Sequence, residues 1–253
     1  MPFFRFLAPA LVAAAIVVPQ TAHAQSFTDA QRSEIQKIIK EYLLANPEVL
    51  EEVSAELTKR QAVADAAKQA SAVKKHSELL FNSPRGVIVG GRDGDVNFVE
   101  FFDYNCGFCK RAMTDMMELM KDDPKLRVTL KEFPVLGQGS VEAAQVAVAV
   151  RMQDPNGKKY LDFHQKLLNS RGQVDKAKAI AAAKESGLDM ARLDKDLASP
   201  EIKATIEESF KMAEDMGLNG TPSYVIGQQV VVGAVGVEAL KEKIAAARRS
   251  GER

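Results

Sequence analysis

The segment that most constrains the fold joins a run of β-forming residues to a helical pattern at a pair of cysteines. Residues 96–102 (Val-Asn-Phe-Val-Glu-Phe-Phe) form a short apolar run of the kind that builds a buried strand. After the pair Cys106 and Cys109, apolar residues recur at spacings of three and four, as on one face of a helix, at Ala112, Met113, Met116, Met117 and Met120. The cysteines are therefore expected where a strand passes into the first turn of a helix, which indicates an α/β fold.

This position determines the chemistry expected of the two cysteines. At a helix N-terminus, the Cys106 thiol would face unpaired backbone N–H groups and the positive end of the helix dipole, and both favour the thiolate. Cys109 lies about one turn further along, where it can close a disulfide with Cys106 or resolve a mixed disulfide formed on it. The pattern predicts thiol–disulfide exchange, with Cys106 as the nucleophile and Cys109 as the resolving cysteine.

Other uses of a Cys-x-x-Cys pair fit this chain less well. The chain contains no further cysteine, whereas structural zinc sites need four ligands and iron–sulfur clusters usually need four thiolates. Attachment of a c-type haem needs a histidine after the second cysteine, where this chain has Lys110. A purely structural disulfide remains the alternative, although one that closes so short a loop would add little stability. No bound cofactor is therefore expected.

Residues 1–24 have the pattern of a secretory signal peptide. Arg5 supplies a positive charge, residues 7–18 are apolar, and residues 22–24 (Ala-His-Ala) form a small-x-small cleavage site. A membrane anchor is the alternative, but the apolar run is too short to span a bilayer and ends at Pro19. Export would bring the cysteines into an oxidising compartment. The 34 acidic and 34 basic residues balance, so no nucleic-acid partner is expected.

Residues 25–80 are predicted to form a helical arm and spacer ahead of the catalytic domain. A capping box at residues 28–31 starts a helix, and Asn46-Pro47 restarts it. Each helix carries an apolar stripe at helical spacing, formed by Ile35, Ile38, Ile39, Tyr42 and Leu43 and by Val49, Leu50, Val53 and Leu57. From Thr58 to Ser77 large apolar residues almost vanish, which is typical of a semi-rigid spacer without a core-facing surface. The stripes could fold back on the catalytic domain, but self-association through residues 26–80 is favoured.

Residues 81–253 are predicted to form a single catalytic domain. Three strands are expected in its first part, at residues 86–90, 96–104 and 126–133. Residues 141–215 are mostly helical in pattern and contain no cysteine, which indicates a helical insertion packed on the fold. A hairpin at residues 224–232 and a final helix at residues 237–248 complete the predicted domain.

This order of elements, together with three short motifs, resembles the DsbA-like thioredoxin fold over about residues 81–248. The motifs lie at residues 101–109 (FFDYNCGFC), 131–137 (KEFPVLG) and 220–224 (GTPSY). Residues 44–50 (LANPEVL) are similar to the suppressor-of-copper-sensitivity protein C (ScsC) branch of this family. The resemblance implies a periplasmic thiol–disulfide oxidoreductase, with a thioredoxin fold, a helical insertion and an N-terminal oligomerisation arm. Some members of this branch trimerise, so a homotrimer is favoured here.

The resemblance also implies roles for residues outside the cysteine pair. The Thr221–Pro222 peptide bond should be cis, and it should present the Thr221 backbone to a bound peptide for strand-like pairing. Glu100, in the middle of an apolar strand, should be a buried carboxylate with a raised pKa that moves protons as Cys109 leaves or attacks. The alternative is an edge-strand carboxylate that faces water.

Three functions remain open at this stage. Gly107 and Phe108, which are expected to contact substrate, lack the histidine that makes the prototypical DsbA strongly oxidising, so a less oxidising couple is expected. We therefore predict a disulfide isomerase or reductase that acts on protein thiols and disulfides, with the membrane-embedded thiol reductant that the resemblance implies. A DsbA-like dithiol oxidase is the second possibility. A copper-handling protein is the third, with Cys106 and Cys109 as Cu(I) ligands. The four methionines after Cys109 could also bind a soft metal, but their spacing more often indicates a core or a peptide-binding surface.

Overall fold

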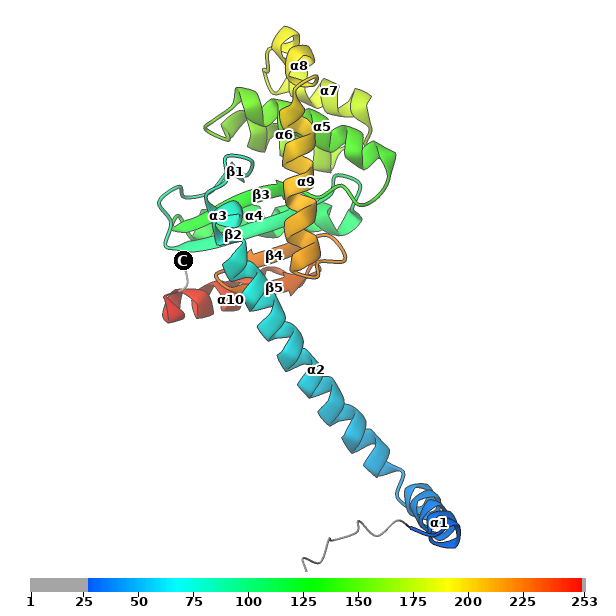
Figure 1. Ribbon diagram of the computed structural model, residues 1–253. Helices are drawn as coiled ribbons and strands as arrows, with labels where there is room; N and C mark the ends of the chain where they lie inside the picture. Colours follow the sequence, from blue (N-terminus) through cyan, green and yellow to red (C-terminus); the bar gives the residue numbers. More distant parts are fainter. Residues whose placement is uncertain (1–26, 252–253) are drawn as a thin grey trace, which may run out of the picture. The chain divides into compact units, whose positions relative to one another are not determined.

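The computed structural model describes residues 27–251, and the predicted signal peptide lies outside this range. The helices are α1 (Asp29–Ala45), α2 (Glu48–Lys75), α3 (Ser77–Phe81), α4 (Gly107–Asp122), α5 (Gln138–Gln153), α6 (Lys158–Asn169), α7 (Lys176–Glu185), α8 (Met190–Asp196), α9 (Pro200–Asp215) and α10 (Val237–Ser250). The strands are β1 (Val87–Ile88), β2 (Val96–Phe102), β3 (Leu126–Glu132), β4 (Ser223–Ile226) and β5 (Gln229–Val232) (Figure 1). The chain forms two compact units that divide between Leu57 and Thr58.

The first unit contains α1 and the first turns of α2. The predicted capping box is present at the start of α1, where the Thr28 hydroxyl accepts a hydrogen bond from the Gln31 N–H and the Gln31 side chain accepts one from the Thr28 N–H. The helix ends at Asn46, one residue before Pro47. No residue of α1 is buried. Most of its apolar stripe is instead exposed, at Ile35, Ile38, Ile39 and Tyr42, and so is most of the stripe on α2, at Leu50, Val53 and Leu57.

The second unit is built on a five-stranded sheet of order β1-β3-β2-β4-β5. The central strands β2 and β3 are parallel and are joined through α4, whereas the other three pairs are antiparallel. A parallel pair needs such a crossover, because its strands cannot be joined by a tight turn. Every residue of β2 except Asn97 is buried, as expected for a strand covered on both faces. The predicted mixed α/β thioredoxin-like fold is confirmed.

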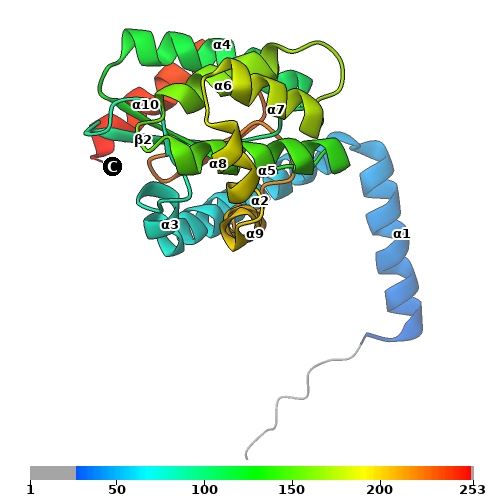
Figure 2. The same cartoon turned by 90° about the horizontal axis from the view of Figure 1, so that it is seen from above.

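Helices cover both faces of this sheet. Figure 2 shows α4 and α10 on one side and α3 and α9 on the other. Because side chains alternate along a strand, Phe98 and Phe102 of β2 pack with α4 and α10, while Val99 and Phe101 pack on the opposite face. The insertion predicted at residues 141–215 corresponds to the five helices α5–α9, which lie between β3 and β4. Helices α5–α8 bury most of their apolar residues in the same cluster as α4. Met113 and Met116 of α4 belong to this cluster, and the partly buried Met117 and Met120 pack against it. Of the two roles expected for these methionines, a core or a peptide-binding surface, the structure shows the core for Met113 and Met116.

The end of α2 corrects one expectation about the spacer. Ala72 and Val73 are buried against Met212 and Met216 in the core of the second unit, although residues 58–77 were predicted to have no core-facing surface. Small side chains let the helix approach closely, and this packing leaves little trace in a hydrophobicity pattern. His76, which was assigned to a polar spacer, is also buried, and its Nε2 lies 2.6 Å from Asp215 Oδ2.

Among the described helices, none is both long and apolar enough to cross a membrane.

Candidate active site

The two cysteines lie where the sequence predicted them, at the start of α4 and just beyond the end of β2. Cys106 is the N-cap residue of α4, with an extended backbone, and Cys109 lies in the first turn. Both thiols are free, and both residues are buried, Cys106 with 5% and Cys109 with 0% of its surface exposed. Cys106, the predicted nucleophile, is thus slightly more exposed than Cys109, which lies wholly within the core.

The surroundings of Cys106 lower the pKa of its thiol to about 5. The largest cause is a hydrogen bond from the Cys109 thiol, and others come from the Thr221 side chain and from the backbone N–H groups of Phe108 and Cys109. Burial opposes this effect but does not overcome it. Cys106 is therefore a thiolate at neutral pH, which is the form that attacks disulfides. The helix end supplies the backbone donors, as the sequence analysis expected, but the neighbouring thiol contributes more.

The pKa of Cys109 is shifted in the opposite direction, far above its ordinary value. Burial is the main cause, and the hydrogen bond given to Cys106 and the negative charge of Glu100 add to it. A thiol in this environment stays protonated until a base removes its proton. The two cysteines therefore differ in charge at neutral pH although they stand only three positions apart.

Glu100 is buried in the middle of β2, with 2% of its surface exposed. Its pKa is raised to about 8, mainly by burial and in addition by the negative charges of Asp115 and Cys106. Its Oε2 atom has no hydrogen-bond partner within the described part of the chain. The alternative of a water-facing carboxylate is thus wrong, while the proton-shuttle role of Glu100 stays a prediction.

The Thr221–Pro222 peptide bond is cis, the conformation that the resemblance implies. It precedes β4, which pairs with β2, and this pairing brings Thr221 to the cysteines. The Cys106 thiol lies 3.1 Å from the Thr221 carbonyl oxygen, to which it can donate when protonated. Gly107 and Phe108 are exposed beside Cys106, and the Arg111 guanidinium stacks 4.6 Å from the centre of the Phe108 ring. The cysteines, Gly107, Phe108 and the cis bond therefore lie beyond the carboxyl end of β2, while Glu100 lies within that strand.

Sequence reasoning assigned no role to Asp103, which organises the loop before Cys106. Its buried carboxylate accepts four hydrogen bonds of 2.7–2.9 Å, from the Asn105, Val135 and Leu136 N–H groups and from the Ser140 hydroxyl. One side chain thus ties the cysteine loop to the segment after β3 and to the start of α5. A polar residue directly after a buried strand was the available signal.

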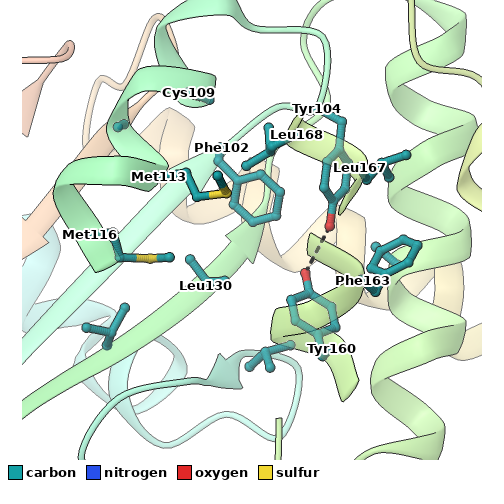
Figure 3. Close-up of a cluster of buried hydrophobic side chains, with 14 of the residues drawn as sticks. Phe102, Tyr104, Cys109, Met113, Met116, Leu130, Tyr160, Phe163, Leu167 and Leu168 are labelled. Carbon is teal, nitrogen blue, oxygen red and sulfur yellow. Dashed lines mark hydrogen bonds between the residues drawn. The ribbon is translucent and has the colours of Figure 1, made fainter. Parts of the chain in front are cut away.

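A buried polar cluster supports the same loop from the side of the insertion. The Tyr104 and Tyr160 hydroxyls are 3.4 Å apart (Figure 3). Both also donate hydrogen bonds to Glu132 Oε1. His164 lies 3.3 Å from the Tyr104 hydroxyl, and burial lowers the pKa of its imidazole to about 3. His164 is therefore a packed, neutral histidine.

No group of three or more His, Cys, Asp and Glu side chains in residues 27–251 is arranged to hold a metal ion. Binding of Cu(I) by Cys106 and Cys109 therefore rests on the two sulfur atoms alone.

Comparison with known proteins adds family relationships to this geometry. Residues 98–245 match the DSBA-like thioredoxin domain, and residues 31–64 match the N-terminal domain of the copper resistance protein ScsC. Among solved structures, a thioredoxin-like oxidoreductase from Silicibacter pomeroyi DSS-3 is 40% identical, with a TM-score of 0.64, and the match covers 68% of this chain and 97% of that one. A linker-deletion mutant of Proteus mirabilis ScsC is 27% identical, with a TM-score of 0.66, over 90% of this chain and 99% of that one.

Curated relatives resemble the chain more distantly. The Na(+)/H(+) antiporter NhaA 1 of Salinispora arenicola is 25% identical over 163 residues, but the chain spans only 25% of its length. Disulfide bond formation protein D of Bacillus subtilis is 24% identical over 172 residues, which cover 62% of this chain and 74% of that protein.

Proposed function

The chain belongs to the DSBA-like thioredoxin domain family and is of the ScsC type, and from this premise we propose that it is a periplasmic protein-disulfide isomerase or reductase. The observation that carries the proposal is the opposite shift of two neighbouring thiols. The pKa of Cys106 is lowered to about 5, while burial raises that of Cys109 far above its usual range. Cys106 is thereby a thiolate that can attack a disulfide, while Cys109 stays a protonated thiol until a base removes its proton.

The exchange begins when the Cys106 thiolate attacks one sulfur of a substrate disulfide. The new bond joins Cys106 to the substrate, and the other substrate sulfur leaves as a thiolate. In isomerisation, a second substrate thiolate attacks the mixed disulfide and expels the Cys106 thiolate unchanged. In reduction, Cys109 attacks instead, which forms the Cys106–Cys109 disulfide and releases the reduced substrate. A membrane-embedded thiol reductant would then supply two electrons to restore the dithiol.

Glu100 would accept the proton that Cys109 loses during its attack. The carboxylate and the thiol are near enough for the charge of Glu100 to raise the pKa of Cys109. A base with a pKa of about 8 is partly ionised at neutral pH, so it can take up a proton and later return it. Its unpartnered Oε2 atom is available for that transfer without the loss of an existing hydrogen bond.

The exposed surface beside Cys106 would hold the substrate peptide. The Thr221 backbone next to the sulfur could pair with an extended peptide, as an added strand does. Apolar side chains gather near the same end of the sheet, with Phe108 56%, Val135 40% and Leu136 50% exposed. Such a surface suits unfolded protein segments, which expose apolar residues that folded substrates bury.

The apolar stripe of α1 supports isomerisation over oxidation. Ile38, Ile39 and Tyr42 each expose more than half of their surface, in a helix without a single buried residue. A second copy of the chain is the occupant we propose for this stripe, with a homotrimer favoured. An oligomer would present several active sites to one misfolded substrate, and it would hinder docking of a membrane oxidase. The cysteines would then stay reduced.

Reactivation of scrambled ribonuclease tests this function. The mature chain should restore ribonuclease activity, and a Cys106→Ser variant should not. Acid trapping and alkylation in intact cells should find Cys106 and Cys109 mostly reduced. A mostly oxidised pair, or rapid oxidation of reduced ribonuclease without reactivation of the scrambled form, would establish the dithiol oxidase instead.

The oligomer has its own matched pair of variants. Ile39→Asp places a charge in the exposed stripe, while Lys40→Asp places the same charge on the neighbouring, also exposed position. Light scattering should give a smaller mass for Ile39→Asp than for Lys40→Asp and the unaltered chain. A wild-type protein that is a monomer at micromolar concentration would contradict the proposal.

A further inference from the structure

A pocket rich in arginine lies at the β1 edge of the sheet, away from the cysteines. It has a volume of about 380 Å³ and is lined by residues of the segment around β1, the start of β3 and the α5–α6 connection. Arg127 in its wall pairs in register with Asn97 at the start of β2, whereas Cys106 follows the end of that strand. The length of β2 separates the two sites by about 20 Å.

Two of the three arginines that line this pocket take part in no ion pair within the described part of the chain. No ion pair within residues 27–251 joins Arg92 or Arg127 to a carboxylate, and their guanidinium groups donate only to neutral oxygens. Burial lowers the pKa of Arg127, and the positive charge of Arg92 lowers it further, while the negative charge of Asp93 acts in the opposite direction. Two guanidinium groups without an ion-pair partner therefore line one pocket, and an anion bound there would reduce the repulsion between them.

The third arginine is compensated but keeps a spare donor. Arg151 pairs with Glu201 at 2.9 Å and also donates to the Thr205 hydroxyl at 3.1 Å. Its Nε–H group is buried and has no partner in the described part of the chain. The remaining charged group in the lining is Asp154, whose Oδ2 accepts a hydrogen bond from the Tyr160 N–H. The net charge of the residues that line the pocket is thus positive, and each of the three guanidinium groups keeps N–H donors that bind no atom of the described chain.

We propose that this pocket binds a phosphate monoester of a small organic molecule. A phosphate group carries nearly two negative charges and three acceptor oxygens, which match two guanidinium groups that lack an ion-pair partner and keep free donors. A single carboxylate would neutralise only one of these charges. The pocket is larger than a phosphate group, and Val87, Ile88 and Met152 give it an apolar wall against which the organic part can pack.

Calorimetric titration of the mature chain at low ionic strength tests the proposal, with inorganic phosphate, phenyl phosphate and succinate as probes. Phenyl phosphate should bind at one site, more tightly than inorganic phosphate or succinate. Arg92→Gln and Arg127→Gln should each weaken its binding at least about tenfold. The control Arg249→Gln removes an exposed arginine outside the pocket and should leave the affinity unchanged.

Three results would overturn the proposal: no saturable binding of either phosphate probe, tighter binding of succinate than of phenyl phosphate, or equal affinities for Arg92→Gln and Arg249→Gln. Because Arg92 is exposed, its variant decides the matter even if Arg127→Gln fails to fold. The proposal does not depend on the function of the cysteines, since disulfide exchange is not its readout.

Discussion

Replacement of Glu100 by glutamine tests whether the buried carboxylate is kept neutral by its surroundings. Burial raises the pKa of this carboxyl from 4.5 to about 8. The folded protein therefore holds the proton over a pH range in which the unfolded chain has released it. The contribution of Glu100 to folding stability must fall as the pH rises from about 4.5 towards 8, because at this group the unfolded state binds fewer protons than the native state.

The size of the effect follows from the two pKa values. Each unit of pKa difference corresponds to about 1.4 kcal/mol. The raised pKa of Glu100 then lowers the free energy of unfolding by about 1.4 kcal/mol near pH 5.5 and by about 4 kcal/mol near pH 8. Glutamine has nearly the same shape but no proton to lose. The stability gained through Glu100→Gln should therefore grow by about 3 kcal/mol between these two pH values.

Guanidinium unfolding of the reduced wild type and the reduced variant at both pH values measures this difference. The titration of Cys106 affects both proteins in the same direction and largely cancels. A gain that is constant with pH to within about 1 kcal/mol would refute the reasoning, because it would mean that Glu100 titrates alike in the folded and unfolded chains. The proposed proton transfer from Cys109 depends on a Glu100 that is partly protonated at neutral pH, and this result would remove that condition.

Two further predictions concern the cysteine loop. The absorbance of the Cys106 thiolate should titrate with a midpoint near pH 5. Cys109→Ala should move this midpoint upward, because it removes the hydrogen bond that is the largest cause of the low pKa. An unchanged midpoint would mean that the backbone N–H donors alone are enough to lower the pKa of Cys106. Asp103→Asn should reduce the free energy of unfolding by roughly 2–4 kcal/mol, because it turns a donor towards two N–H groups of the segment after β3. Chemical unfolding should show no comparable loss for the exposed Asp194→Asn, and equal losses would refute the role of Asp103.

The cysteine site was predictable from sequence because its signals are local. The run of β-forming residues, the spacing of the cysteines and the helical stripe after them all fall within residues 96–120. The helical insertion and the C-terminal hairpin were also visible as changes of hydrophobic period. The cis bond at Pro222 and the burial of Glu100 came only with the family resemblance, because neither a proline nor a glutamate in isolation indicates them.

Contacts between distant segments were not predictable in the same way. The carboxylate of Asp103 binds N–H groups about thirty positions away, and backbone donors have no sequence signature. Ala72 and Val73 are buried because Met212 and Met216 pack against them, whereas their own small size gives no sign of a core position. The difference in pKa between the two cysteines likewise depends on depth in the core, which the motif leaves undetermined.

The two buried glutamates show why a raised pKa alone does not identify a proton carrier. Burial raises the pKa of both Glu100 and Glu132 to about 8. Glu132 accepts hydrogen bonds from Tyr104 and Tyr160, so protonation or movement of its carboxylate would disturb bonds that hold the insertion to the sheet. Glu100 keeps an unpartnered oxygen and acts on the pKa of Cys109 through its charge. Only Glu100 therefore combines a suitable pKa with an open position and a proton donor, so Glu100→Gln should slow the attack of Cys109 while Glu132→Gln should leave that step unchanged.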